Sequence, residues 1–212
     1  MIGKIARYIL WGSVGAIVGV SIGIAGNSIG KHEEKFMFWP HAKISYEDYD
    51  GHGSATHIGN GYFLTAAHVI KDGKTPLVDM SESEVLWVNK KYDVALLKSD
   101  GENNDHLNLD CREPEVGERI SMSGNPLNLE SVTTWGQVSG SPREVGPWAL
   151  VSPINAAIAP GMSGGALMDE GGNLIGVNVG VMVMPVGSAG GPVGIGYSVP
   201  ASVVCMLMGL DR

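Results

Sequence analysis

The order of apolar and polar positions divides the chain into two unlike parts. Residues 8–29 carry no charged side chain and consist largely of Ile, Val, Gly, Leu and Ala, over about the 20 residues that a bilayer-crossing helix needs. From residue 44 onwards, short apolar runs alternate with clusters of Gly, Lys and Asp, which is the pattern of short strands and turns. The pattern predicts a transmembrane helix followed by an all-β domain.

Charges beside the apolar run predict its orientation. Lys4 and Arg7 precede it, whereas residues 31–35 mix bases with acids, so the positive-inside rule places the N-terminus in the cytoplasm and the folded domain in a periplasm or its equivalent. The alternative is a cleaved signal peptide and a secreted protein, although the apolar core of such peptides is shorter, about 7 to 15 residues. We expect an anchor over residues 1–30, a linker over 31–43 and a folded domain over 44–212.

The linker contains the aromatic cluster Phe36–Pro40. Such a cluster is expected either at the lipid interface, where aromatic side chains collect, or against a neighbouring subunit.

The remaining apolar runs predict the strands of the folded domain, with a polar connection over 100–110 and a short helix over 201–210. The strands are expected at 61–66, 76–78, 85–88, 94–97, 119–124, 133–139, 148–151, 166–168, 174–181 and 194–198.

Composition narrows the classes of function. The net charge of −8 argues against a nucleic-acid-binding surface, which is normally basic, so no nucleic-acid partner is expected. Cys111 and Cys205 lie far apart without metal-ligand spacing, and we expect two buried free thiols, with a single bridge as the alternative. His52 and His57 are five residues apart on a turn and strand, which is not a ligand motif, and both are expected at the solvated surface. No metal or organic cofactor is expected.

The segment around Ser163 carries the clearest chemistry. Glycines flank this serine at positions 161, 164 and 165, and glycine permits a sharp turn that leaves backbone N–H groups pointing into a pocket. In acyl transfer, the amides of Gly161 and Ser163 would stabilise the oxyanion, with a contribution of roughly a hundred- to a thousand-fold in rate for each good donor. The alternative is a flexible turn without function.

A base and a carboxylate accompany the serine. His68 ends an apolar, strand-like run, and Asp93 begins another, where a lone carboxylate is costly to bury unless it is paired. A serine nucleophile needs a base, and the base needs an orienting group. The order His68, Asp93, Ser163 is that of the chymotrypsin arrangement.

These residues resemble the signature boxes of trypsin-fold serine proteases. The boxes are Thr65–His68, Asp93–Leu97 and Gly161–Gly165, and four further stretches resemble the HtrA (Deg-type) branch. The four stretches are 116–127, 132–139, 172–178 and 194–200. Two features depart from that branch: Met162 stands where Asn is usual, and no PDZ domain is expected after Arg212.

The resemblance implies an all-β fold of two antiparallel six-stranded β-barrels, over about 44–112 and 113–200, with a short C-terminal helix. It implies a serine endopeptidase acting on protein or peptide substrates. The site would lie in the cleft between the barrels, with His68 as base, Asp93 as its orienting group and Ser163 as nucleophile. It also implies a trimer formed through the aromatic N-terminal segment.

The resemblance places the floor of the primary pocket at the residue six before the nucleophile, here Ala157, which has no carboxylate to attract Lys or Arg. The resemblance adds Ile195 and the strand Asn178, Val179 and Gly180 as pocket walls, so small apolar P1 residues are expected. By the same resemblance, the Gly-rich stretch 185–194 is expected to be mobile. The alternative function is a catalytically silent, membrane-tethered binding or chaperone-like module, and Met162 is the local feature that favours it.

Overall fold

The computed structural model describes residues 41–100, 105–127, 129–186 and 189–210. The predicted span over 8–29 and the aromatic cluster Phe36–Pro40 lie outside the described residues. Contacts divide the chain into residues 1–36 and 37–212, so the folded domain belongs to the second unit. Within the described ranges, no helix has the length and apolar character needed to cross a membrane.

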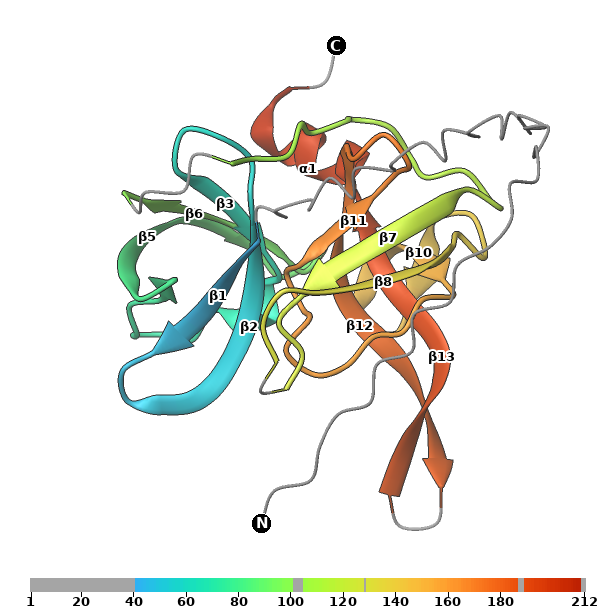
Figure 1. Ribbon diagram of the computed structural model, residues 1–212, viewed down its shortest axis with the longest axis horizontal. Coiled ribbons are helices and arrows are strands. Elements are labelled where there is room, and N and C mark those ends of the chain that lie inside the picture. Colours follow the sequence, from blue (N-terminus) through green and yellow to red (C-terminus); the bar gives the residue numbers. More distant parts are fainter. Residues whose placement is uncertain (1–40, 101–104, 128, 187–188, 211–212) are drawn as a thin grey trace, which may run out of the picture. The chain divides into compact units, whose positions relative to one another are not determined.

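The first half of the domain is a closed barrel of six antiparallel strands in the order β1-β2-β3-β6-β5-β4, as the resemblance predicts (Figure 1). Its strands are β1 (His41–Tyr46), β2 (Tyr49–His57), β3 (Tyr62–Thr65), β4 (Leu77–Val78), β5 (Ser81–Asn89) and β6 (Val94–Ser99). Strand β6 is buried along most of its length, which explains its continuous apolar sequence. Phe63, Leu64 and Leu97 are among the largest fully buried side chains.

The second half is a sheet of seven strands in the order β8-β7-β11-β12-β13-β10-β9. Its strands are β7 (Arg119–Gly124), β8 (Val132–Gln137), β9 (Arg143–Val145), β10 (Trp148–Ile154), β11 (Ala166–Met168), β12 (Leu174–Val186) and β13 (Ala189–Pro200). An antiparallel bridge between Val138 and Ile154 joins the end of β8 to β10 and curls six of the strands into a barrel-like shape. The prediction of six strands is therefore corrected: β9, only three residues long, adds a seventh by pairing with β10.

Strands β12 and β13 continue beyond the barrel as a long hairpin (Figure 1). Met184 pairs with Gly191, and Pro185 pairs with Gly190. The described residues of the stretch 185–194 take part in this hairpin ladder, and the mobility expected for the stretch stays a prediction. Antiparallel pairing with β12 satisfies backbone groups of this Gly-rich strand.

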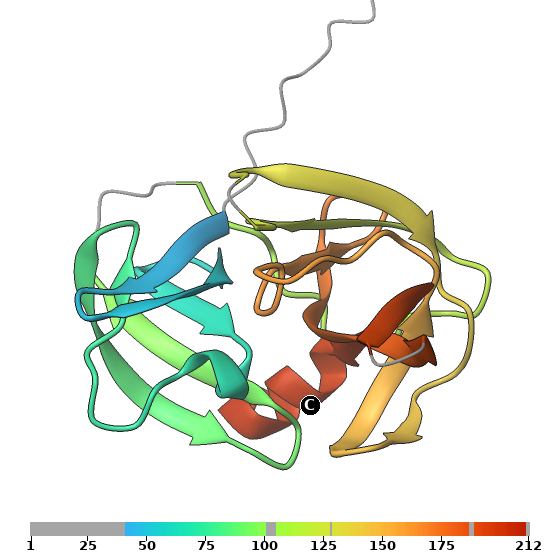
Figure 2. The ribbon, with the colours of Figure 1, turned by 90° about the horizontal axis from the view of Figure 1, so that it is seen from below.

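The closing helix α1 (Ala201–Met208) lies between the two halves of the domain (Figure 2). It ends at Gly209, whose left-handed conformation (φ 68°) lets its N–H bond back to the carbonyls of the last turn. Val203 and Val204 belong to a buried cluster that runs from the first barrel to β10, β12 and β13. Because this apolar core is continuous across both halves, it fixes the position of one barrel against the other.

Cys111 and Cys205 form a disulfide, with their Cα atoms 5.7 Å apart. The prediction of two free thiols is therefore wrong and the alternative is confirmed. The bond ties the segment between the barrels to α1 across a sequence separation of 94 residues, which spacing along the chain does not reveal. Stable structural disulfides are typical of oxidising, extracytoplasmic compartments.

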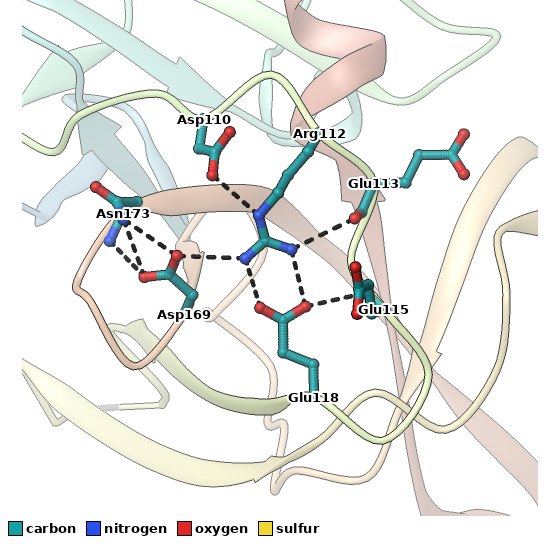
Figure 3. A network of polar contacts seen from close by, with 7 residues as sticks. All are labelled: Asp110, Arg112, Glu113, Glu115, Glu118, Asp169 and Asn173. Carbon is teal, nitrogen blue, oxygen red and sulfur yellow. Dashed lines mark hydrogen bonds and ion pairs between the residues drawn. The ribbon is translucent and has the colours of Figure 1, made fainter.

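Arg112, the next residue, holds the same segment through a charged network (Figure 3). Its guanidinium contacts Glu118 through both terminal nitrogens at 2.9 and 2.5 Å, Asp110 at 2.9 Å and Asp169 at 3.3 Å. Hydrogen bonds from Arg112 lower the pKa of Glu118 despite its partial burial. Partial burial acts to raise the pKa of Asp169, but hydrogen bonds from Asn173 and Arg112 outweigh it and leave that pKa below its usual range.

Candidate active site

The imidazole of His68 is presented on a short 3-10 helix, Ala67–Val69, that follows β3. Ala67 and Val69 point into the core, and the His68 side chain keeps 48% of its surface exposed. Its Nδ1 lies 2.8 Å from Oδ2 of Asp93, and its backbone N–H donates to Oδ1 at 2.9 Å. Both carboxylate oxygens are thus used to hold one histidine, and among the described residues no hydrogen bond engages its Nε2.

Asp93 sits in the turn between β5 and β6, in a left-handed backbone conformation (φ 58°) that Asp tolerates better than most residues. Its side chain is only 10% exposed. A third donor, Nε1 of Trp148 on β10, lies 2.9 Å from Oδ2. Sequence reasoning missed Trp148. The available signal was that a partly buried indole N–H normally needs an acceptor, although the sequence alone does not say which.

Ser163 lies in a tight turn between β10 and β11, where Gly161 (φ 98°) and Gly164 (φ 89°) adopt conformations that side chains disfavour. The turn is clamped by Ser54 of β2: its N–H donates to the Ser163 carbonyl at 2.8 Å and its Oγ to the Gly161 carbonyl at 2.7 Å. A Cβ on Gly164 would collide with the Ser54 carbonyl and with Oγ1 of Thr65. The glycines therefore allow close contact between the barrels, and the flexible-turn alternative does not describe this segment.

The amides of this turn divide into two groups. The N–H groups of Met162, Gly164 and Gly165 donate to the carbonyls of Ala159, Asn178 and Met162, in that order. The N–H groups of Gly161 and Ser163, in contrast, have no hydrogen-bond partner within the described ranges. The Pro160 carbonyl accepts from Leu127, so the Gly161 N–H, at the other side of that trans peptide, points away from Leu127. Two unpaired amides at these positions are what an oxyanion hole requires.

Two neighbouring pockets bring the three predicted residues together. His68, Ser163 and Gly161 line a pocket of about 230 Å³. His68 also lines a pocket of about 520 Å³ with Asp93, Trp148 and Val179. A larger pocket of about 690 Å³ lies on β7 and β8, but it holds neither a histidine nor the nucleophile candidate. The chemistry of the lining residues, and not pocket size, therefore selects the site at His68.

The residues predicted to form the walls of the P1 pocket lie in different surroundings. Val179 lines the pocket beside His68, Gly180 lies under the indole of Trp148, and Ile195 is half-buried. The Asn178 side chain is buried and donates to the carbonyls of Ser123 and Ala166, so it serves the sheet.

Ala157 is exposed, and its carbonyl accepts from Oγ1 of Thr134. Its neighbour Ile158, which sequence reasoning passed over, points its side chain at Gly196, where a Cβ would collide with Cδ1. Ile158 is thus the apolar side chain that fills the space in front of this strand.

Two histidines expected at the surface are buried or engaged instead. His52 lines the pocket with Ser163, and its Nε2 lies 2.9 Å from the Asn125 carbonyl. A Cβ on Gly161 would lie 2.5 Å from the same nitrogen, so His52 packs against the predicted oxyanion hole. His57 is 2% exposed and stacks on Phe63. Among the described residues, no group of three or more His, Cys, Asp or Glu side chains is suited to a metal.

A family profile described as a trypsin-like peptidase domain matches residues 53–177. The chain belongs to this family. Protease Do-like 1, chloroplastic, of Arabidopsis thaliana is 32% identical over 158 residues, which cover 68% of this chain and 35% of that protein. A probable periplasmic serine endoprotease DegP-like of Halomonas elongata is 32% identical over 153 residues, 68% of this chain and 31% of that protein. The chain thus spans about a third of the length of these curated relatives.

Solved protease structures share the fold of this trypsin-like domain. The HtrA-type protease AlgW with a tripeptide has a TM-score of 0.69 and 28% identity, over 80% of this chain and 59% of that one. The serine endoprotease from Yersinia pestis has a TM-score of 0.66 and 28% identity, over 81% of this chain and 62% of that one. The resemblance to the HtrA branch is therefore confirmed.

Proposed function

We propose that the chain is a serine endopeptidase that hydrolyses peptide bonds through His68, Asp93 and Ser163. The observation that supports this most is the double hydrogen bond from His68 to Asp93, with Ser163 lining the same pocket as the imidazole. His68 removes the proton of Ser163 as its Oγ attacks the scissile carbonyl, and returns that proton to the leaving amine. Asp93 keeps the imidazole in the required tautomer and stabilises its cation.

The amides of Gly161 and Ser163 bind the oxyanion that forms as the carbonyl becomes tetrahedral. Their lack of other partners among the described residues supports this role. Such preorganised donors stabilise the transition state without reorganisation during the reaction. Water then attacks the acyl-enzyme by the same route, with His68 as base again.

The substrate chain runs along the edge of β12. Asn178 is the last residue of that edge whose backbone pairs with the Ser163 turn, through Gly164 and Gly165. From Val179 onwards the edge is open to a peptide, which would add as an antiparallel strand. Ala157, Ile195, Val179 and Gly180 then surround the P1 side chain, and an apolar pocket without a carboxylate selects small residues such as Val or Ala.

The proposal also covers where the chain is located and how it assembles. The disulfide between Cys111 and Cys205 supports an oxidising, extracytoplasmic compartment, as does the periplasmic assignment in the name of the Halomonas relative. The apolar run over 8–29 tethers the domain to a membrane, with cleavage and secretion as the alternative. Assembly as a trimer rests on the family resemblance alone.

The silent binding module is the weaker alternative. Its one supporting feature was Met162 beside the nucleophile. Met162 is 1% exposed and packs in a buried cluster with Met122 and Ile154, so core packing explains the departure from Asn. A change inside the core leaves the groups that perform the chemistry in place.

Hydrolysis of chromogenic peptides tests the proposal. The purified full chain should cleave a peptide with Val at P1 faster than the matched peptide with Arg. Ser163→Ala should lower kcat by about 10,000-fold or more, because nucleophile and base act as a unit. Binding of the peptide to wild type without any cleavage would favour the silent module, and faster cleavage after Arg would refute the pocket assignment.

A further inference from the structure

Donors from both halves of the domain hold the carboxylate of Asp93. His68 supplies Nδ1 and its backbone N–H from the first barrel, at 2.8 and 2.9 Å. Trp148 supplies Nε1 from the start of β10, at 2.9 Å. The oxygen Oδ2 therefore accepts from the imidazole and the indole at the same time. A side chain 10% exposed has little water available to replace either donor.

The backbone of the same turn is also held from β10. The N–H of Ala149 donates to the carbonyl of Lys91 at 3.1 Å, two residues before Asp93. A left-handed conformation at a non-glycine residue persists only where its surroundings enforce it. Trp148 and Ala149 together supply that enforcement, one through its side chain and the other through its backbone.

Trp148 is itself fixed in place. Its ring packs at 5.4 Å from the ring of Tyr197, centroid to centroid. A Cβ on Gly180 would lie 2.5 Å from Cη2 of the indole, so the absence of a side chain at 180 makes room for it. The indole is therefore not free to turn its N–H towards another acceptor.

We propose that Trp148 is a positioning residue for the reaction. Its indole completes the hydrogen bonding of the Asp93–His68 pair only when β10 packs against the β5–β6 turn. This inference rests on the proposed function, because positioning matters to a reaction only if His68 acts as base. The second half of the domain then helps to orient His68 and Asp93, which both belong to the first barrel.

Removing the indole N–H should move the pH dependence of activity in a predictable direction. With the donor present, the negative charge on Oδ2 is shared between indole and imidazole. Without it, that charge acts on the imidazole alone, which favours the imidazolium and moves the acid limb of activity to higher pH. Other charged or titratable groups lie near the pair among the described residues. Asp72 and Lys90 line the pocket of about 520 Å³ with His68 and Asp93, and Nζ of Lys71 lies 3.4 Å from the His68 carbonyl. Tyr46, Tyr49 and His52 line the pocket of about 230 Å³. All of them remain when only the indole N–H is removed.

The test is Trp148→Phe in the full chain, with Trp135→Phe as the control because that indole is 73% exposed. In peptide hydrolysis, Trp148→Phe should lower kcat about tenfold with a smaller change in KM. The acid midpoint of kcat/KM should rise by about 0.5 pH unit. Trp135→Phe should change neither. An unchanged midpoint and kcat in a folded Trp148→Phe variant would overturn the proposal.

A second readout does not need turnover. In a Ser163→Ala background with ¹³C-labelled histidine, the ring resonance of His68 can be titrated by NMR with and without Trp148→Phe, and should show the same upward shift. If wild type cleaves nothing but the shift is seen, the proposed function and the role of Trp148 in that reaction both fail, whereas the effect of the indole on the Asp93–His68 pair stands. If Trp148→Phe does not fold, benzothienylalanine at 148, which replaces N–H by sulfur in the same shape, takes its place with the same expected outcomes.

Discussion

The disulfide between Cys111 and Cys205 fastens the segment that connects the two barrels to the helix that closes the chain. Cys205 is fully buried in the α1 face that packs on the barrels. The bond therefore constrains both halves of the domain against each other, and the active-site candidates come from both halves.

Loss of this bond should lower stability without changing the chemistry. Closing a loop of this length removes much conformational freedom from the unfolded chain, so Cys111→Ala with Cys205→Ala should lower the free energy of unfolding by about 2–5 kcal/mol. Urea unfolding with and without reductant measures this. Reductant should destabilise wild type and leave the double variant unaffected; equal sensitivity of both proteins would contradict the assignment.

The Arg112 network should make stability depend on pH. Because Arg112 lowers the pKa of folded Glu118 below its ordinary value of 4.5, the ionised pair stabilises the fold above that value, and the stabilisation is lost as pH falls through the lower, folded-state pKa. Glu118→Gln should therefore cost about 1 kcal/mol at pH 7, discounted for the partial exposure of Arg112, and much less near pH 3.

A matched control is Glu170→Gln, which breaks an exposed ion pair with Arg119 at 3.6 Å. Exposed pairs contribute little, so this variant should change the unfolding free energy by less than about 0.5 kcal/mol at either pH. A cost for Glu118→Gln that stays constant from pH 7 to pH 3 would show that ionisation is not its source.

Alanine at position 52 should affect catalysis, whereas alanine at position 57 should affect stability. His52 packs on Gly161 from inside the pocket, so His52→Ala should lower kcat about fivefold through a looser oxyanion hole and change stability little. His57 is buried and bonds at Nδ1 to the Asp105 carbonyl, so His57→Ala should cost about 2 kcal/mol of stability. Peptide kinetics and urea unfolding of both variants separate the two roles; a normal kcat for His52→Ala would remove His52 from the site.

Ile158 should limit the size of the P1 residue. Its side chain lies against Gly196, so Ile158→Ala would open that space. The ratio of kcat/KM for Leu over Val at P1 should rise about tenfold, the magnitude that a methylene or two is worth in an apolar pocket. An unchanged ratio would mean that P1 binds elsewhere.

The sequence predicted the parts of this domain whose signals are local. Strands β7 and β11 begin and end at their predicted residues, because each is a short run with clear turn residues on both sides. His68, Asp93 and Ser163 could be selected as candidates because each is embedded in its own motif. Strands β1, β2 and β9 had no predicted range, and β9, with three residues, is too short to show alternation.

What the sequence did not predict depends on contacts between distant residues. Trp148 and Asp93 lie 55 positions apart, and the two cysteines 94. No periodicity links such pairs, and only the folded core brings them together. The burial of His57 has the same origin, because Phe63 and the Asp105 carbonyl reach it from other segments.

The central claim is that His68 activates Ser163, and covalent labelling tests it most directly. The purified chain is treated with a fluorophosphonate at pH 8, and the adduct is located by intact mass and peptide mapping. We predict one adduct per chain, on Ser163, absent in Ser163→Ala and formed at least about 100-fold more slowly in His68→Ala. No adduct on folded wild type, or an adduct that persists in Ser163→Ala, would contradict the account.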